Sequence, residues 1–309
     1  MSHNSNLHTA RKKGNDEFYT RLIDIEKELT NYKDYFRDKV VYCNCDDPKH
    51  SKFITYFTTN FHLLGLRKLI ATFYAPTQYD CTHITETPIK WVYDGTNTTK
   101  TKLSGNGSFA SKECLDILSD VDVVVTNPPF SLFRDFVDIL VTYNKDFLII
   151  GNQNAITYKE IFPFIKEGTI KLGINNVKQF VCPTDYVNVN DNKNIKYDSE
   201  LECNIAIFGN IGWFTTLTTK KQNKEITLTK SFNPIDYPLY DNCNAINIRR
   251  VKDIPKDYYG KMGVPAITFI KNYNPKQFEI VGYRKGDDGK DLKLNGKYVY
   301  TRILIERIR

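Results

Sequence analysis

The residues with the clearest chemical potential in this 309-residue chain are Asn127-Pro128-Pro129-Phe130. The Asn127 side-chain carbonyl and the Pro128 backbone carbonyl can both accept hydrogen bonds, and consecutive prolines supply no competing N–H donor. Two acceptors aimed at the N–H groups of an exocyclic amine would favour a tetrahedral nitrogen and free its lone pair for attack on a methyl donor. The Phe130 ring offers a face on which a base can stack. The tetrapeptide therefore predicts a catalytic site that methylates an amine.

The position of this tetrapeptide strengthens the prediction. The preceding run 121–126 is rich in valine, which is typical of a strand buried on both faces of a parallel sheet. Ligands of open α/β sheets bind beyond the carboxyl ends of the strands, where Asn127 falls. An Asn-Pro pair can also simply begin a turn. The order of strand, motif and helix favours the catalytic interpretation.

The elements that would position the motif alternate along the first half of the chain. Apolar spacing predicts helices within 16–36, 51–64, 111–118 and 133–140, and strands at 40–43, 69–74, 89–93, 121–126 and 147–150. This alternation predicts an α/β fold with a Rossmann-like, doubly wound sheet, and the motif at its strand end makes it a candidate methyltransferase sheet. After about residue 168, the short apolar segments 205–208, 266–270 and 303–305 alternate with polar loops, which predicts a C-terminal, more β-rich region.

Three parts of the chain are expected from this organisation. Residues 1–15 form a flexible basic arm that ends near Arg11-Lys12-Lys13. Residues 16–170 form the catalytic domain, and 171–309 form a target-recognition region partly packed into it. The basic arm suits contact with phosphates better than contact with bases.

The segment after the first predicted strand, Cys43-Asn44-Cys45-Asp46-Asp47-Pro48, is a candidate cofactor loop. Many methyltransferases carry a glycine-rich loop there, and this chain has no glycine in the segment. The carboxylate of Asp46 or Asp47 could meet an ammonium group or ribose hydroxyls of a cofactor. Either aspartate could instead cap the following helix.

Composition indicates a polyanionic partner and gives no sign of a metal. The net charge is +7 and the aromatic share is 13%, although many proteins with neither nucleic-acid partner nor special stacking residues have similar values. Seven cysteines without a CxxC pair fit neither a disulfide framework nor a zinc site, and favour a reducing cytoplasm. The five histidines lack ligand spacing, and the sequence contains neither a membrane-length apolar run nor a signal peptide. We therefore expect no metal and no membrane association.

Several segments together resemble one enzyme family. They are 16–20 (DEFYT), 40–48 (VVYCNCDDP), 127–134 (NPPFSLFR), 149–160 (IIGNQNAITYKE) and 263–265 (GVP). They are similar to the EcoRI-type adenine-specific (N6) DNA methyltransferases, from about residue 14 to the C-terminus. The resemblance implies S-adenosylmethionine as methyl donor, double-stranded DNA as substrate, and a catalytic region that precedes the target-recognition region.

The resemblance also implies roles for individual residues. The implied cofactor-binding residues are Asp16, Phe18, Tyr19, Thr20, Cys43, Asn44, Asp46, Phe73, Ser108, Phe109 and Asn127. Ser108 stands where the related segment often has aspartate, and Phe73 where an acidic residue is usual. Without the resemblance, segment 16–20 could be an acidic helix start. Trp213 and Phe214 are candidates, with Phe130, for the walls that stack on the target base, and core packing is the competing explanation.

The expected reaction requires the adenine to be flipped out of the duplex. Base-reading candidates are the basic and amide residues Lys178, Gln179, Lys220, Lys221, Gln222, Arg249, Arg250, Arg284 and Lys285. The resemblance implies GAATTC as the site, in a bacterial or phage-encoded cytoplasmic enzyme for restriction-modification or phage protection. A cognate endonuclease would act beside it without a stable complex. Methylation of RNA or of a protein glutamine, and a non-catalytic DNA-binding role, are the alternatives.

Overall fold

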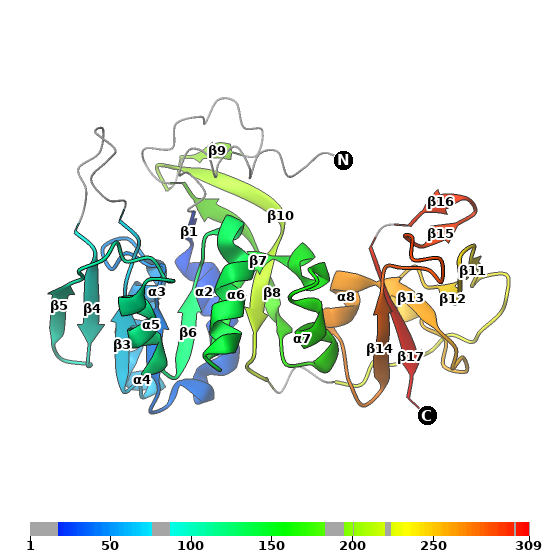
Figure 1. Ribbon diagram of the computed structural model, residues 1–309, viewed down its shortest axis with the longest axis horizontal. Coiled ribbons are helices and arrows are strands. Elements are labelled where there is room, and N and C mark those ends of the chain that lie inside the picture. The colour runs from blue at the N-terminus through cyan, green and yellow to red at the C-terminus, as the bar shows by residue number, and fades with distance from the viewer. Residues whose placement is uncertain are drawn as a thin grey trace. The chain divides into compact units, whose positions relative to one another are not determined.

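The protein is described by a computed structural model that covers residues 18–75, 87–182, 195–199, 201–219, 224–299 and 301–308 (Figure 1). The chain forms two compact units. One comprises Met1–Ala155 with Leu172–Leu217, and the other comprises Ile156–Lys171 with Thr218–Arg309. The division therefore differs from the boundary expected at 170/171. The chain leaves the first unit after one strand of its sheet and returns to add further strands to the same sheet.

The first unit is built on a ten-stranded mixed sheet. Its order is β1 (Tyr19–Thr20), β8 (Lys171–Val181), β10 (Cys203–Thr215), β7 (Asp146–Asn152), β6 (Val123–Thr126), β2 (Val40–Cys43), β3 (Lys68–Ala71), β4 (Ile89–Tyr93) and β5 (Thr98–Lys102), with β9 (Ile195–Asp198) paired to β10. The neighbours β7, β6, β2 and β3 are parallel. Strands β4 and β10 join this centre in antiparallel fashion. The parallel, doubly wound part of the prediction is thus confirmed only for the centre of the sheet.

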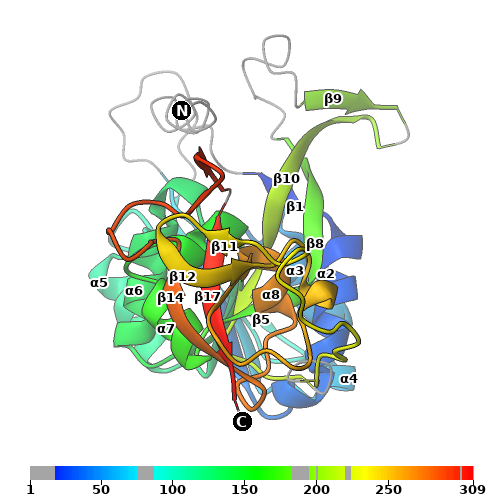
Figure 2. The same ribbon diagram turned by 90° about the vertical axis from the view of Figure 1, so that its right-hand side faces the viewer.

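Helices cover both faces of this sheet. In Figures 1 and 2, α5 (Lys112–Ser119) and α6 (Phe133–Thr142) lie on one face, and α2 (Leu22–Leu29), α3 (Lys52–Thr59) and α4 (Phe61–Leu64) lie on the other. The central strands β2 and β6 are buried at every position, as expected for strands covered twice. The predicted helix at 51–64 is interrupted at Asn60, and the one within 16–36 ends as the 3₁₀ helix η1 (Thr30–Phe36).

A buried carboxylate fastens α2 to β8 in the first unit. Glu28 is fully buried, and its oxygens accept hydrogen bonds from the backbone N–H groups of Ile174 and Asn175, each at 2.8 Å. Asn175 Nδ2 donates at 2.8 Å and the Tyr32 hydroxyl at 3.2 Å. Burial raises the pKa of Glu28, and these donors offset part of that effect. Four donors converge on one carboxylate, so the helix is held at a defined place beside β8.

The second unit is centred on a smaller sheet. The order is β11 (Leu239–Tyr240), β12 (Cys243–Asn247), β13 (Met262–Pro265), β17 (Arg302–Arg307) and β14 (Phe278–Tyr283). Beside these strands are the hairpin β15 (Lys293–Leu294) with β16 (Lys297–Tyr298), and the helices α7 (Phe162–Glu167), α8 (Ala266–Lys271) and η5 (Val251–Asp253). The apolar segment 266–270 is helical, because Ala266, Phe269 and Ile270 recur at helical spacing and are buried together. Among the described residues, no helix has the length and apolar character needed to cross a membrane.

Candidate active site

The site lies where the chain order of the central sheet reverses. From β2 the chain continues through α3 and α4 to β3 on one side, whereas β6 pairs with β2 on the other side and leads through α6 to β7. Both β2 and β6 end at the same edge, because they are parallel neighbours. Connections that diverge in this way leave a crevice outside the carboxyl ends of the strands, where α/β proteins bind ligands. Asp46 and Asn127 follow these two strand ends.

Asn127 has one side-chain atom anchored and one unused. Its Nδ2 donates to the backbone carbonyl of Phe18 at 2.7 Å. The carbonyl of Phe18 can only accept, which fixes the orientation of the amide and turns Oδ1 away from Phe18. Within the described part of the chain, Oδ1 is buried and has no hydrogen-bond partner. Asn127 therefore presents a fixed, unsatisfied acceptor.

The two prolines after Asn127 shape the turn that follows. Pro129 adopts φ −54° and ψ 124°, and its carbonyl accepts from the Leu132 N–H at 3.0 Å, which begins the 3₁₀ turn η2 (Phe130–Leu132). No hydrogen bond between described residues ends on the Pro128 carbonyl. The turn thus uses the Pro129 carbonyl in its own hydrogen bond and leaves the Pro128 carbonyl available. The role of Asn127 and Pro128 as paired acceptors stays a prediction.

Asp46 joins the two strand ends. Its Oδ1 accepts from the Ser51 hydroxyl at 2.6 Å and its Oδ2 from the Thr126 hydroxyl at 2.5 Å, while its backbone N–H donates to the Thr72 carbonyl at 3.1 Å. Burial raises the pKa of Asp46 to about 6, against the lowering effect of the two hydroxyl donors and with a small rise from Asp47. A carboxylate has about four acceptor sites, so two remain for a ligand.

The alternative that these aspartates cap a helix does not hold. The N-cap of α3 is Ser51, whose hydroxyl oxygen accepts from the backbone N–H groups of Phe53 and Ile54. The side chain of Asp47 accepts from the Lys49 N–H within the preceding turn. Asp46 is thus held between Ser51 and Thr126, next to the switch point of the sheet.

Other predicted cofactor residues lie at neighbouring strand ends. Phe73 follows β3, and Gly107 has φ +73° with its backbone against the Phe73 carbonyl, so closely that a Cβ atom would collide. This contact brings Ser108 beside Phe73. Phe109 is buried and packs edge-on against Phe136, with ring centroids 4.9 Å apart. Ser108 and Phe73 are half-buried, and their cofactor roles stay predictions, as does that of Phe109.

The N-terminal candidates are only partly described. Phe18 supplies the carbonyl that anchors Asn127. Tyr19 and Thr20 form β1, and the Thr20 hydroxyl oxygen is buried without a partner among the described residues. Asp16 and the basic arm lie outside the described residues, so their predictions stay predictions. Asn44 is buried at the end of β2.

The prediction for the Cys43 side chain is wrong. Cys43 is completely buried in the hydrophobic core beneath the sheet, and burial raises the pKa of its thiol well above the usual value. Its backbone carbonyl accepts from the Thr72 N–H at 3.1 Å. The side chain of Cys43 is therefore a core residue and not a group available to a cofactor.

The prediction for Trp213 and Phe214 also needs correction. Both are 0% exposed. Trp213 packs edge-on against Phe53 at 5.9 Å, and Phe214 packs against Phe133 at 5.0 Å. Adjacent residues of a strand point to opposite faces, and helices cover both faces of the sheet here. The two rings are therefore core residues and have no free face for a base.

Phe208 is an aromatic residue near Phe130 that the sequence analysis did not include among the base-stacking candidates. Phe208, Phe130, Phe18 and Phe180 form a phenylalanine cluster in which Phe208 lies 6.3 Å from Phe130, 5.1 Å from Phe18 and 5.7 Å from Phe180. Phe18 and Phe180 are buried, whereas Phe130 and Phe208 are half-buried. Strand β10 pairs with β7 only over Ile211–Thr215, so Phe208 lies past the covered part of the strand. The break of the apolar run at Gly209-Asn210 is the sequence feature that could have separated Phe208 from Trp213 and Phe214.

Several base-reading candidates already have acidic partners. Arg250 binds Asp253 through Nε at 2.7 Å and Nη2 at 3.2 Å, and Arg284 binds Asp291 through Nε at 2.8 Å. Lys285 also contacts Asp291, at 3.0 Å. Gln179 accepts from Arg21, whereas Lys178 and Arg249 are exposed. Lys220, Lys221 and Gln222 lie outside the described residues. No group of histidine, cysteine or acidic side chains that could hold a metal occurs in the described ranges.

The mixed α/β sheet, its switch point and the unsatisfied acceptor of Asn127 are features expected of the α/β methyltransferase class. Comparison with known proteins specifies the class further. The family described as "Adenine-specific methyltransferase EcoRI" matches residues 6–307. The Type II methyltransferase M.EcoRI of Escherichia coli is 44% identical, over 99% of this chain and 97% of its own length. M.MgeORF184P of Mycoplasma genitalium is 37% identical and M.MpnI of Mycoplasma pneumoniae 35%, each over 96% of this chain and 97% of its own length.

The chain therefore belongs to the EcoRI family of adenine-specific methyltransferases, as the sequence resemblance predicts. It is a methyltransferase of the Type II kind that modifies adenine in DNA. This result favours DNA methylation over methylation of RNA or protein and over a non-catalytic DNA-binding role. No solved structure matches the chain.

Proposed function

We propose that this enzyme transfers the methyl group of S-adenosylmethionine to N6 of an adenine flipped out of duplex DNA. The observation that carries the proposal is the buried, unsatisfied Oδ1 of Asn127 beside an anchored Nδ2. A buried acceptor without a partner costs about 1–3 kcal/mol. The amine of a bound adenine would supply the missing donor, so substrate binding would recover this free energy.

The residues of the motif would act on the amine in concert. Asn127 Oδ1 and the Pro128 carbonyl accept from the two N–H groups of the amine and favour a tetrahedral nitrogen. S-adenosylmethionine supplies a methyl group bound to a positively charged sulfur. In the proposed reaction the amine nitrogen would attack the methyl carbon, an N–C bond would form as the C–S bond breaks with its electrons retained by sulfur, and the methylated amine would then lose a proton to solvent. Neither a metal nor a covalent enzyme intermediate has a role in this proposal.

The target base would be held by the phenylalanine cluster. The amine of a stacked adenine is out of reach inside the duplex, and enzymes that act on such a base flip it out at a cost of a few kcal/mol. Phe130 and Phe208 are the half-buried members of the cluster, and base–aromatic stacking contributes about 1–3 kcal/mol per base. We assign them as the two walls of the base pocket, with Phe208 in place of Trp213 and Phe214.

The residues around the switch point fit the cofactor. Asp46 has unused acceptor sites and can meet the ammonium group or the ribose hydroxyls, and Thr20 offers a second buried, unsatisfied oxygen. The close approach at Gly107 packs the turn that carries Ser108 against the backbone of Phe73, so that both predicted cofactor residues lie together. Asp16, Tyr19, Asn44 and Phe109 complete the proposed set.

Target recognition is assigned to the second half of the chain, from residue 171 to 309. The family relationship supports GAATTC as the recognition sequence, and a cognate endonuclease that acts separately on the same site. The bacterial relatives support a bacterial or phage gene that acts on cytoplasmic DNA in restriction-modification or phage protection.

Methyl transfer from labelled S-adenosylmethionine tests this function. The enzyme is incubated with matched duplexes that contain GAATTC or a scrambled site, and with RNA and protein. The proposal expects N6-methyladenine only in the GAATTC duplex, together with protection from an endonuclease that cuts GAATTC. Label in RNA or protein would contradict it. Label in the scrambled duplex would overturn the recognition sequence alone.

A further inference from the structure

The second unit contains a hollow lined by basic side chains. Its volume is about 560 Å³, and it lies between the extended segment 224–227, the 3₁₀ helix η5 and the helix α8, which is orange in Figure 1. Lys224, Arg250, Lys252 and Lys271 line it, and we call this set the basic hollow. Glu225 is the one carboxylate among its lining residues. The lining side chains therefore carry a net positive charge even though Arg250 is paired with Asp253, and this charge suits an anion.

The backbone around the basic hollow is fixed by buried groups. The side chain of Gln277, which is buried, accepts from the Ile226 N–H at 2.8 Å and donates to the Ile226 carbonyl at 2.7 Å. This double contact holds the segment that carries Lys224. On the opposite rim, Val251 is buried and anchors η5 between Arg250 and Lys252. The cations therefore project from positions that are set before any ligand binds.

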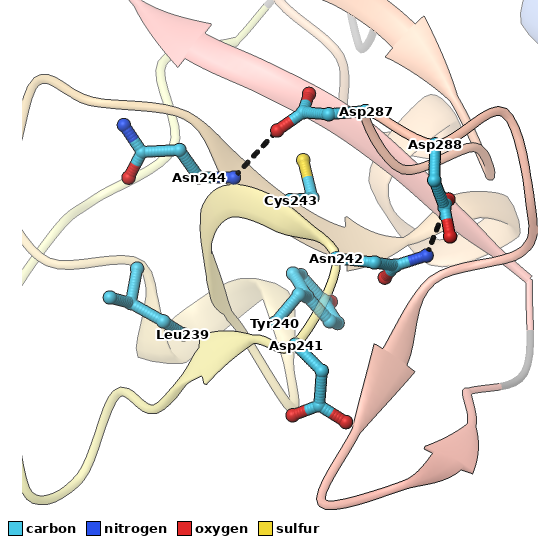
Figure 3. A pocket seen from close by; sticks show the side chains of 8 residues that line it. All are labelled: Leu239, Tyr240, Asp241, Asn242, Cys243, Asn244, Asp287 and Asp288. Atoms are coloured by element: carbon cyan, nitrogen blue, oxygen red, sulfur yellow. Dashed lines mark hydrogen bonds between the residues drawn. The ribbon is translucent and has the colours of Figure 1, made fainter.

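A second hollow of the same unit has the opposite character. It is lined by residues 239–244, 287 and 288, and includes Asp241, Asp287 and Asp288 (Figure 3). Their carboxylates accept internal hydrogen bonds, for example Asp287 from the Asn244 N–H at 3.2 Å and Asp288 from Asn242 Nδ2 at 2.9 Å. This acidic hollow would repel a polyanion. The second unit therefore has one hollow lined mainly by cations and another lined by carboxylates.

The cations of the basic hollow suit phosphate better than the edge of a base. An arginine reads a guanine through two N–H groups of its guanidinium, and Arg250 already uses Nε and Nη2 to bind Asp253. Lysine ammonium groups are point charges on flexible stems, which bind phosphate oxygens without selecting a base. Phosphate contacts fix the register of a protein on the duplex and carry no direct sequence information.

We infer that the basic hollow binds backbone phosphates of the DNA substrate, which makes Lys224 and Lys252 positioning residues outside the catalytic site. The inference rests on the proposed function only in taking duplex DNA as the partner. Each lysine that neutralises a phosphate releases counterions, so the logarithm of the binding constant falls with the logarithm of salt concentration with a slope of about −0.9 per contact.

The test is the salt dependence of DNA affinity for the Lys224→Gln/Lys252→Gln double variant. We expect weaker binding at low salt and a slope that is shallower by about 2, to the same extent on GAATTC and scrambled duplexes. The Lys100→Gln/Lys102→Gln variant removes the same charge from the exposed edge strand β5 and should keep the wild-type slope and activity. Thermal melting and S-adenosylmethionine affinity, both expected at wild-type values, establish that the double variant is folded.

Three outcomes would overturn the inference. An unchanged slope in the folded double variant would show that these lysines do not contact phosphates. A loss of affinity confined to the GAATTC duplex would show that these lysines read bases. The double variant could also lose competition between pyrophosphate and DNA without any change in the salt slope. That result would show a site for free anions. The proposed function is tested separately, by the loss of methyl transfer in an Asn127→Ala enzyme. That enzyme should retain the wild-type salt slope.

Discussion

Asn127 is held by the backbone of Phe18. The 2.7 Å hydrogen bond from Asn127 Nδ2 to the Phe18 carbonyl spans 109 residues of sequence and determines which side-chain atom is left without a partner among the described residues. Because the amide nitrogen is engaged, the oxygen is the atom left for a ligand. A catalytic acceptor is most effective when it is already oriented before the substrate arrives. Phe18, which directly precedes the edge strand β1, thus fixes the orientation of the Asn127 side chain.

The phenylalanine cluster gives a prediction that separates Phe208 from Trp213. Phe208→Ala should weaken stacking of the flipped adenine by about 1–3 kcal/mol and leave the fold intact. A 2-aminopurine placed at the target position should then show less of the fluorescence change that accompanies flipping. Trp213→Ala removes a fully buried ring and should lower the free energy of unfolding by about 3–5 kcal/mol. Normal flipping by Phe208→Ala would remove Phe208 from the base pocket.

Asp46 gives a prediction about pH. Its pKa of about 6 in the folded protein means that the carboxylate becomes protonated as the pH falls below 6. If the ionised form binds the cofactor ammonium or ribose, affinity for S-adenosylmethionine should fall up to about tenfold per pH unit below that value. Calorimetry between pH 5 and 8 measures this. Asp46→Asn should bind more weakly at pH 8 and lose the pH dependence, and an unchanged profile in that variant would contradict the role.

The same residue should make stability depend on pH. A carboxyl whose pKa is raised from 3.8 to about 6 stabilises the fold relative to Asp46→Asn most at low pH, and that contribution declines as the pH rises from about 4 to 6. Two pKa units correspond to about 3 kcal/mol. Urea unfolding of both proteins at pH 4 and pH 7 should show this change in their difference. A difference that is constant with pH would argue against a titrating Asp46.

Glu28 should contribute strongly to stability. Glu28→Gln places an amide N–H group among four donors, and Glu28→Ala leaves them without an acceptor. Each buried unsatisfied group costs about 1–3 kcal/mol, so both variants should unfold at clearly lower urea concentrations. Glu26→Gln, on the exposed side of the same helix, is the matched control and should change little. Equal stability of the Glu28 and Glu26 variants would contradict this assignment.

Local patterns in the sequence predicted the centre of the fold well. The valine-rich run before Asn127 is β6, the following apolar spacing is α6, and the strands at 40–43 and 89–93 are β2 and β4. These predictions succeed because periodicity and β-branched residues act over a few neighbouring positions. The position of Asn127 just beyond the end of a strand was predicted by the same reasoning.

The sequence did not predict features that depend on distant pairing. The bond between Asp46 and Thr126 joins residues 80 positions apart, and no local pattern records it. The choice between Phe208 and Trp213 depends on where β7 ceases to pair with β10, which is a property of sheet register. The antiparallel strands β8 and β10 joined the first unit for the same reason, so the boundary predicted at residue 170 did not match.

Single-turnover methyl transfer by Asn127→Ala tests the central claim most directly. With enzyme and S-adenosylmethionine in excess over a GAATTC duplex, transfer should be slower than wild type by at least about 10²–10³-fold, because an oriented transition-state contact is lost. Cofactor affinity should stay near the wild-type value. The Asn97→Ala enzyme, altered in the exposed turn between β4 and β5, should react normally. A wild-type rate in Asn127→Ala would contradict the account.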